Sequence, residues 1–195
     1  MIAVLDSGFG NVRSALAAFG ALGLDADLVA DPRALAKAQR VVFPGVGSWG
    51  AVMSRLRERA LDEALIDFIS TGRPFLGICM GLQVLFASSE EDEGAGLGLL
   101  EGSVVKFRAP KTPQIGWNLV EPAQSASPAV PRGYFYFINS FHARPNDSRV
   151  VAANANYMGE EFVAAVEREN ILAVQFHPEK SARAGLELLR RWSKS

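Results

Sequence analysis

The chain has 195 residues, of which 49% are hydrophobic and 21% charged, and its formal net charge is −1. This length suggests one domain, and this composition supplies a sizeable core and argues against general disorder. The near-neutral charge without a basic block argues against nucleic acid as a primary partner, and no apolar run approaches the ~20 residues that cross a bilayer.

The first half of the chain alternates short apolar runs with amphipathic segments. Residues 2–5 predict a strand rather than a signal peptide, because no basic segment precedes them. Further strands are expected at residues 26–30, 41–43 and 75–78. Helices are expected at about 11–22, from Asp31-Pro32 onward, and over 49–70 with a break near 57–61. This order predicts a parallel sheet with helices on both faces, and ligands beyond the carboxyl ends of its strands.

The second half changes character. Residues 88–98 are acidic and rich in glycine, which predicts a solvated connection. A loop rich in Pro, Ala and Ser is expected at 122–131, and a final helix at 182–192. Short strands are expected between these segments, at 103–107, 116–120, 134–138, 150–153, 162–167 and 171–175. The chain is therefore expected to be one domain, residues 1–195, with a flavodoxin-like α/β sheet: a mainly parallel core with additional antiparallel or mixed strands.

A Gly-x-Cys-x-Gly pattern follows the fourth expected strand, at residues 77–81. It is the thiol version of the nucleophile elbow, a sharp strand-to-helix turn that exposes the nucleophile. A helix expected from Met80 to Ala87 would direct its N-terminal N–H groups at the sulfur. A lone cysteine is also commonly a small buried hydrophobe, so Cys79 alone leaves both interpretations open. One cysteine forms no internal disulfide and fits a reducing cytoplasm, the expected location.

The segment from Gln175 to Glu179 contains one of the two histidines. Pro178 disfavours a helical conformation of His177, and in an extended chain Glu179 would point to the same side and orient the imidazole. A nucleophile, a histidine and an acid together form a catalytic triad. His142 has no adjacent acid and is interpreted as structural. One Cys and two His separated by 35 residues match no metal-ligand spacing, so no metal and no cofactor are expected.

These motifs resemble those of a known family. Residues 77–83 and 176–179 are similar to the nucleophile and His-Pro-Glu motifs of the class I glutamine amidotransferases. Within this family the chain is most similar to the glutaminase subunits of imidazole glycerol phosphate synthases, from histidine biosynthesis. The segments that carry this finer resemblance are residues 6–14, 44–47, 116–118 and 177–181. The resemblance covers essentially the whole chain.

The resemblance implies a mechanism in which Cys79 attacks the side-chain amide of L-glutamine, His177 relays a proton to the departing ammonia, and Glu179 orients His177. It implies that the oxyanion is held by amides of Met80, Val46 and Gly47. It implies substrate contacts from Gly45, Gln83, Ser140 and Phe141. It implies a partner interface that includes Asn11, Asn118, Asn139 and Lys180.

The implied partner is a separate cyclase subunit, a (β/α)8 barrel, in a heterodimer. It would use the ammonia to form imidazole glycerol phosphate and an aminoimidazole carboxamide ribotide. Three positions depart from the pattern of many relatives, which have Tyr for Ser7 and His for Gln114 and Asn139.

Two alternatives remain at this stage. The first is a glutaminase subunit of another synthase, such as anthranilate synthase, whose oxyanion segment usually has Pro where Val46 stands. The second is a non-catalytic flavodoxin-like binding module, which leaves residues 177–179 unexplained.

Overall fold

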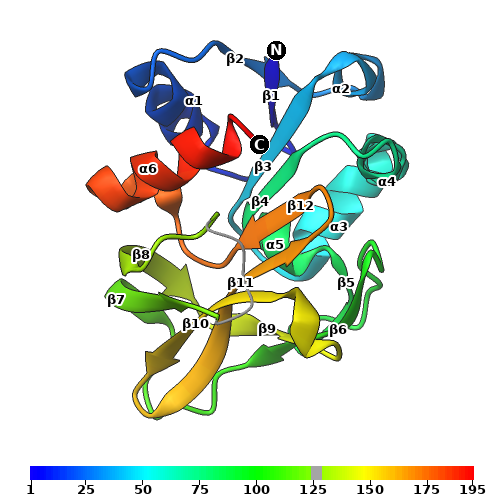
Figure 1. Ribbon diagram of the computed structural model, residues 1–195. Helices are drawn as coiled ribbons and strands as arrows, with labels where there is room; N and C mark the ends of the chain where they lie inside the picture. Colours follow the sequence, from blue (N-terminus) through cyan, green and yellow to red (C-terminus); the bar gives the residue numbers. More distant parts are fainter. Residues whose placement is uncertain (124–128) are drawn as a thin grey trace.

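The computed structural model of the protein describes residues 1–123 and 129–195, so the loop expected at 122–131 lies partly outside the described residues. One long sheet runs through the molecule (Figure 1). Its first part is parallel and has the strand order β2 (Ala26–Val29), β1 (Ile2–Leu5), β3 (Arg40–Gly45), β4 (Phe75–Cys79) and β12 (Ile171–Val174).

The sheet continues beyond β12 with antiparallel strands: β11 (Glu160–Arg168), β10 (Val151–Tyr157), β7 (Gln114–Pro122) and β8 (Gly133–Asn139). A side branch joins the sheet where β9 pairs with β11, and it consists of β9 (Phe141–Pro145), β6 (Leu100–Lys106) and β5 (Phe86–Ser89). The expected α/β fold, a parallel core with antiparallel strands from the second half, is confirmed.

Helices cover both faces of the parallel part (Figure 1). One face carries α1 (Val12–Ala21) and α6 (Ala182–Trp192), and the other carries α2 (Pro32–Lys37), α3 (Trp49–Glu58) and α4 (Leu61–Ser70). Local signals define their ends. The Asp31 side chain accepts a hydrogen bond of 3.0 Å from Ala34 N and caps α2, and Ala60, with φ 52°, separates α3 from α4. The shorter helical segments are α5 (Met80–Gln83), η1 (Ser148–Val150) and η2 (Pro178–Lys180).

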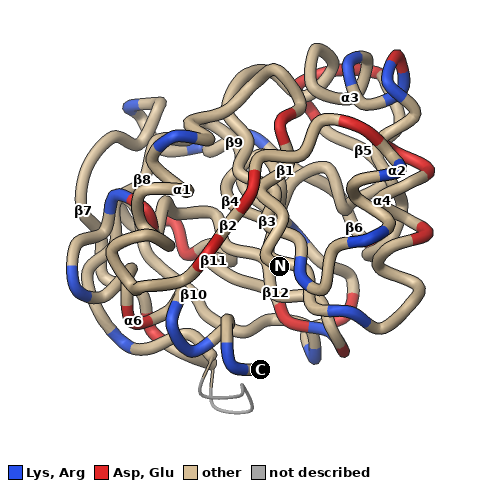
Figure 2. The backbone as a smooth tube through the Cα atoms, turned by 90° about the horizontal axis from the view of Figure 1, so that it is seen from above, with Lys and Arg blue, Asp and Glu red and all other residues tan. Residues whose placement is uncertain are grey.

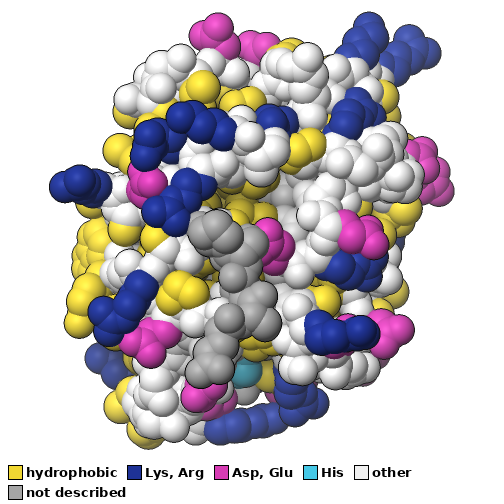
Figure 3. All heavy atoms as spheres, in the orientation of Figure 1, with side chains coloured by type: hydrophobic (Ala, Val, Ile, Leu, Met, Phe, Trp, Pro, Cys, Tyr) yellow, Lys and Arg dark blue, Asp and Glu magenta, His cyan; other side chains and the backbone are white. Residues whose placement is uncertain are grey.

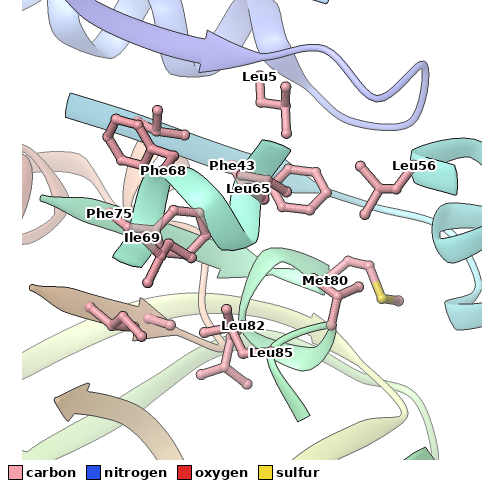
Figure 4. Close-up of a cluster of buried hydrophobic side chains, with 14 of the residues drawn as sticks. Leu5, Phe43, Leu56, Leu65, Phe68, Ile69, Phe75, Met80, Leu82 and Leu85 are labelled. Atoms are coloured by element: carbon pink, nitrogen blue, oxygen red, sulfur yellow. The ribbon is translucent and has the colours of Figure 1, made fainter. Parts of the chain in front are cut away.

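The central strands are buried on both faces. Along β4, Phe75 packs in the core beneath α3 and α4, whereas the next residue, Leu76, packs beneath α1 and α6. Figure 4 shows the first of these clusters, with Phe43, Leu65 and Phe75 side by side. Successive strand side chains point to opposite faces, so a strand covered on both sides is apolar throughout. This burial makes the sheet a rigid support for whatever its carboxyl ends carry.

Part of the sequence prediction is wrong just after this core. The helix expected from Met80 to Ala87 ends at Gln83, and the chain re-enters the sheet as β5, which pairs with β6. The strand β9 was not expected at all. In both cases the strand is stabilised by a distant partner strand, and a local apolar pattern does not contain that information.

Charged residues are spread over the surface, with Lys and Arg among Asp and Glu (Figure 2). In residues 1–123 and 129–195, no helix is long and apolar enough to cross a membrane.

Candidate active site

A sharp turn at Cys79 ends β4 and begins α5. The residue has φ 54° and ψ −103°, a backbone conformation that costs a residue with a side chain about 1–3 kcal/mol. A Cβ atom on Gly77 would strike the carbonyl of Gly81, and one on Gly81 would strike the carbonyl of Phe43. The two glycines therefore allow α5 to lie against β3 and β4, and the strand-to-helix turn predicted from the pattern is confirmed.

The segment after β12 brings His177 and Glu179 together. Nδ1 of His177 lies 2.8 Å from Oε1 of Glu179, and both side chains are only 2% exposed. His177 is extended, as its position before Pro178 predicted, but Glu179 lies in the 3-10 turn η2. The expected contact is present, but the expected extended chain is wrong, because a helical turn brings the carboxylate back to the ring.

The charge of His177 depends on its two neighbours. Burial lowers the pKa of His177, but the Cys79 sulfur and the Glu179 carboxylate outweigh burial and raise that pKa to about 10. Nε2 of His177 is buried and has no hydrogen-bond partner among the described residues. The imidazole therefore carries its proton at neutral pH, and Nε2 is available for proton transfer.

The backbone of His177 is attached to strand β8. Its N–H donates to the carbonyl of Tyr136 at 2.8 Å. The hydroxyl of Ser181, 1% exposed, donates to the His177 carbonyl at 2.6 Å and accepts from Tyr136 N at 2.9 Å. The histidine is therefore held against β8 as well as against its own turn.

A cavity of about 310 Å³ lies at the carboxyl ends of β3 and β4 and contains both Cys79 and His177. Its other lining residues are Val46, Gly47, Met80, Gln83, Glu91, Pro113, Ile138, Asn139, Ser140 and Phe141. A larger cavity, of about 620 Å³, lies at the opposite edge of the sheet beside Pro74 and Trp192. None of the candidate residues lines that second cavity, so the smaller one is the candidate site.

Most residues singled out from the sequence are brought together at this cavity. Gly45 is not on its wall: it is buried in β3 and pairs with Cys79 across the sheet. Asn139 is 5% exposed and donates to the Phe141 carbonyl at 3.0 Å. The remaining predicted interface residues lie away from the cavity wall: Asn11 caps α1, Asn118 donates to Asn156 O, and Lys180 lies half-buried in η2.

Sequence reasoning missed two polar residues at the site, Glu91 and Gln175, and two apolar residues of the cavity wall, Pro113 and Ile138. Glu91, in the segment interpreted as a solvated connection, accepts a hydrogen bond from Trp49 N at 2.9 Å and lines the cavity. Gln175, which is fully buried, directs its Nε2 at the Cys79 sulfur at 3.6 Å. No local signal distinguishes Glu91 from the neighbouring acidic residues, whereas Gln175 stands two residues before His177 and could have been considered.

The second histidine has a partner that the sequence did not suggest. Nε2 of His142 lies 3.4 Å from Glu160 Oε1, which comes from β11. His142 was interpreted as having no adjacent acid, and that is wrong in space. Burial lowers its pKa despite this carboxylate. It lies among Phe107 and Phe162, outside the cavity wall, so it remains structural.

The arrangement at the cavity has a recognisable chemistry: a thiol on a strained turn, and an imidazole oriented by a carboxylate. A family model described as "Glutamine amidotransferase class-I" matches residues 3–193. The chain belongs to the class-I glutamine amidotransferases. The chain shares its fold with a solved structure described as "Crystal structure of glutamine amidotransferase", which superposes with a TM-score of 0.78 at 21% identity; the match covers 98% of both chains.

Curated members of the amidotransferase family are similar over their whole length. A Rhodopirellula baltica protein is 43% identical over 199 residues, which is 99% of this chain and 97% of that protein. A Methanothermobacter thermautotrophicus protein is 46% identical over 197 residues, which is 98% of this chain and 97% of that protein. Both relatives are named "Imidazole glycerol phosphate synthase subunit HisH".

Proposed function

We propose that this class-I amidotransferase is the glutaminase subunit of an imidazole glycerol phosphate synthase. It hydrolyses L-glutamine to glutamate and passes the ammonia to a separate cyclase subunit in the cytoplasm. The observation that carries the proposal is the meeting of Cys79 and His177 at one cavity, with Glu179 2.8 Å from the far side of the His177 ring. Full-length similarity to relatives named as HisH subunits supports the pathway.

The proposed reaction begins with attack of the Cys79 sulfur on the side-chain amide carbon of glutamine. The His177 imidazolium then donates its Nε2 proton to the departing nitrogen, so ammonia leaves and a glutamyl thioester forms. The neutral imidazole next takes a proton from water, whose oxygen attacks the thioester and releases glutamate. Glu179 holds the ring by its Nδ1 throughout, which keeps Nε2 as the reacting nitrogen.

The developing oxyanion needs N–H donors near the sulfur. Met80 is the first residue of α5, and the first N–H groups of a helix have no intrahelical partner. Val46 and Gly47 line the same cavity from the end of β3, and Gly47 has φ 115°. We assign the oxyanion to the amide of Met80 and to an amide of the Val46–Gly47 segment.

The cavity also holds groups that suit the α-ammonium end of a free amino acid. Oε1 of Gln83 is buried with no partner among the described residues, and Glu91 supplies a carboxylate on the same wall. Both are acceptors, as the α-ammonium group of glutamine requires. Ser140 and Phe141 line the cavity beside them and are proposed as further substrate contacts. Gly45 is proposed to support the site from within β3, where it pairs with Cys79 of β4.

The partner is proposed to dock on the solvent face of strands β7 and β8. Ile115 is 64% exposed, Trp117 54% and Tyr134 62%, and Ile138 pairs with Ile115 across the two strands. Figure 3 shows hydrophobic side chains along the edge of the molecule where β7 and β8 lie. Such a cluster on a sheet face marks an interaction surface. Ile138 also lines the cavity, so a cyclase barrel docked here would lie beside the site of ammonia release.

We propose that the remaining interface residues contribute less to cyclase binding than the exposed side chains of β7 and β8. Lys180, in η2, follows the catalytic segment directly. Asn118 lies on the opposite face of β7 from Trp117, and Asn139 is buried, so we assign both to supporting the surface from behind. Asn11 caps α1, and we assign it to the periphery of the interface.

The test is glutamate release from glutamine by the purified chain, measured with and without the cyclase subunit and the ribonucleotide that the cyclase binds. Strong stimulation by the liganded cyclase is the expected result. Hydrolysis at the same rate with and without the cyclase would support the glutaminase reaction but would assign the chain to another synthase. An absence of hydrolysis under every condition would contradict the proposal. A second arm replaces Trp117 with Arg, which should abolish stimulation, because a charge would be buried at the interface.

A further inference from the structure

A chain of buried side-chain amides connects the carbonyl of Phe141 with the sulfur of Cys79. Nε2 of Gln83 donates to Phe141 O at 3.1 Å and to Oε1 of Gln175 at 3.1 Å. Nε2 of Gln175 then points to Cys79 Sγ at 3.6 Å. Gln83 is 3% exposed and Gln175 is fully buried, so water does not compete for these bonds.

The network fixes the direction of every amide in it. A backbone carbonyl only accepts, so Gln83 must present its NH2 group to Phe141. The second hydrogen of that group requires an acceptor, so Gln175 must present Oε1 to Gln83. The NH2 group of Gln175 is therefore left facing the sulfur, and a flip of either amide would place two donors or two acceptors against each other.

The sheet places Gln175 at this position. Strands β12 and β4 are parallel neighbours, with Val174 opposite Ile78, so Gln175 and Cys79 leave the sheet side by side. The backbone N–H of Gln175 donates to Ala164 O at 2.8 Å, which ties the residue to β11 as well. The amide is consequently held in place before any substrate arrives.

We propose that Gln175 stabilises the thiolate form of Cys79 and holds the sulfur in its reactive orientation. Its NH2 group has no acceptor for a thiol proton, and a donor favours the charged form of its partner. The same contact would serve both steps of the reaction, since the sulfur is an anion before attack on glutamine and again when it leaves the thioester. This inference rests on the proposed role of Cys79 as the nucleophile.

The test replaces Gln175 with Glu, which keeps the oxygen that Gln83 needs and exchanges the donor for a carboxylate oxygen. The readout is the rate of alkylation of Cys79 by iodoacetamide across pH, followed by mass spectrometry. In Q175E the profile should shift to higher pH by about one unit, so that alkylation on the rising limb of the profile is roughly tenfold slower at a given pH. In turnover, kcat should fall while KM changes less than about twofold, because Gln175 is not on the cavity wall.

The chain offers a matched control at the other end of β12. Asn170 donates to the carbonyls of Ile69 and Arg73 at 2.9 and 2.7 Å, so N170D makes the same amide-to-carboxylate change far from the sulfur. N170D should leave the alkylation profile unchanged. If Q175E does not fold, Gln175→Met removes the donor without adding charge and should give a smaller shift in the same direction.

A folded Q175E or Gln175→Met variant with the wild-type alkylation profile would overturn the inference. Alkylation does not require glutamine hydrolysis, so the two proposals can fail separately. A profile that depends on Gln175 in a protein without glutaminase activity would uphold this inference and contradict the proposed function.

Discussion

The protein contains two buried histidines, each facing a glutamate, and the two pairs behave in opposite ways. The ring of His177 lies 2.8 Å from Glu179, and that of His142 lies 3.4 Å from Glu160. Burial lowers the pKa of both rings. At His177 the neighbouring sulfur and carboxylate reverse this effect and raise the pKa to about 10, whereas at His142 burial prevails.

The difference lies in the third neighbour. His177 has the sulfur of Cys79, while His142 has the ring of Phe107, with centroids 4.7 Å apart. The Glu160 carboxylate also accepts hydrogen bonds from the backbone N–H groups of Arg108 and Ala109, at 2.8 and 2.9 Å. A carboxylate beside a buried histidine is therefore not enough to raise the pKa of its ring, and at His177 the sulfur adds to the effect of the carboxylate.

The largest expected effect is on activity. His177→Gln should lower glutamine hydrolysis by about 10²–10⁴-fold, because it removes the group that we propose as the proton donor to ammonia. His142→Gln should leave hydrolysis within about twofold of wild type, since His142 is not on the cavity wall. Steady-state glutamate release in the presence of the liganded cyclase measures both. Equal losses of hydrolysis in the two variants would contradict the different roles assigned to His177 and His142.

The second expected effect is on the titration of the two rings, followed by NMR of the imidazole carbons. In Cys79→Ala the pKa of His177 should fall from about 10, because the sulfur contributes to its elevation. The pKa of His142, below the ordinary value of 6.5, should not move. An unchanged His177 titration would show that Glu179 alone holds the proton.

The same shifts give opposite dependences of stability on pH. The pKa of His177 is raised, so its contribution to the free energy of unfolding is present below about 6.5 and is lost as pH rises through about 10. The pKa of His142 is lowered, so acidification below about 6.5 favours the unfolded chain, which binds the proton more readily. Urea unfolding at pH 5 and pH 8 should therefore show less acid sensitivity in His142→Gln than in wild type.

The third effect tests the structural pair directly. Glu160→Ala removes the acceptor of two backbone N–H groups and of His142, and should lower the free energy of unfolding by roughly 2 kcal/mol. Glu179→Ala should lower hydrolysis far more than Glu160→Ala does, because Glu179 contacts the ring that we propose as the proton donor. Denaturant titration measures the stability of both variants, and glutamate release measures their activity. Parallel losses in both assays would contradict the different roles assigned to Glu160 and Glu179.

The smallest expected effect concerns the attachment of His177 to β8. Ser181→Ala removes the hydroxyl that links the His177 carbonyl with Tyr136 N, and should cost about 1 kcal/mol of stability and a few-fold in kcat. Ser193→Ala, in which an exposed hydroxyl loses its bond to Arg190 O, is the matched control and should change neither quantity. The His142 spectrum should be the same in all three proteins.

The site could be anticipated from the sequence where its geometry is local. The turn at Cys79 follows from two glycines four positions apart, Gly77 and Gly81, and His177 and Glu179 are two positions apart. The parallel core was predictable for a similar reason, because alternation of apolar runs and amphipathic segments is a local pattern.

What could not be anticipated depends on pairing between distant segments. Glu160 reaches His142 because β9 lies against β11, and Glu91 reaches the cavity because its carboxylate binds Trp49 N, 42 residues away. Gln175 meets Cys79 through the register of β12 on β4, a separation of 96 residues. The end of α5 at Gln83 is likewise set by the pairing of β5 with β6. Such contacts follow from topology, and no window of sequence contains them.

The backbone conformation of Cys79 affects how the protein loses activity on heating or in denaturant. Its conformation, φ 54° and ψ −103°, is held on one side by β4 and on the other by α5, a helix of only four residues. Mild heat or denaturant that loosens α5 would let residue 79 relax to an ordinary conformation, and the sulfur would turn away from its imidazole while the sheet stays intact. Inactivation should therefore occur at a lower temperature than unfolding, so the melting temperature overstates the range over which the enzyme works.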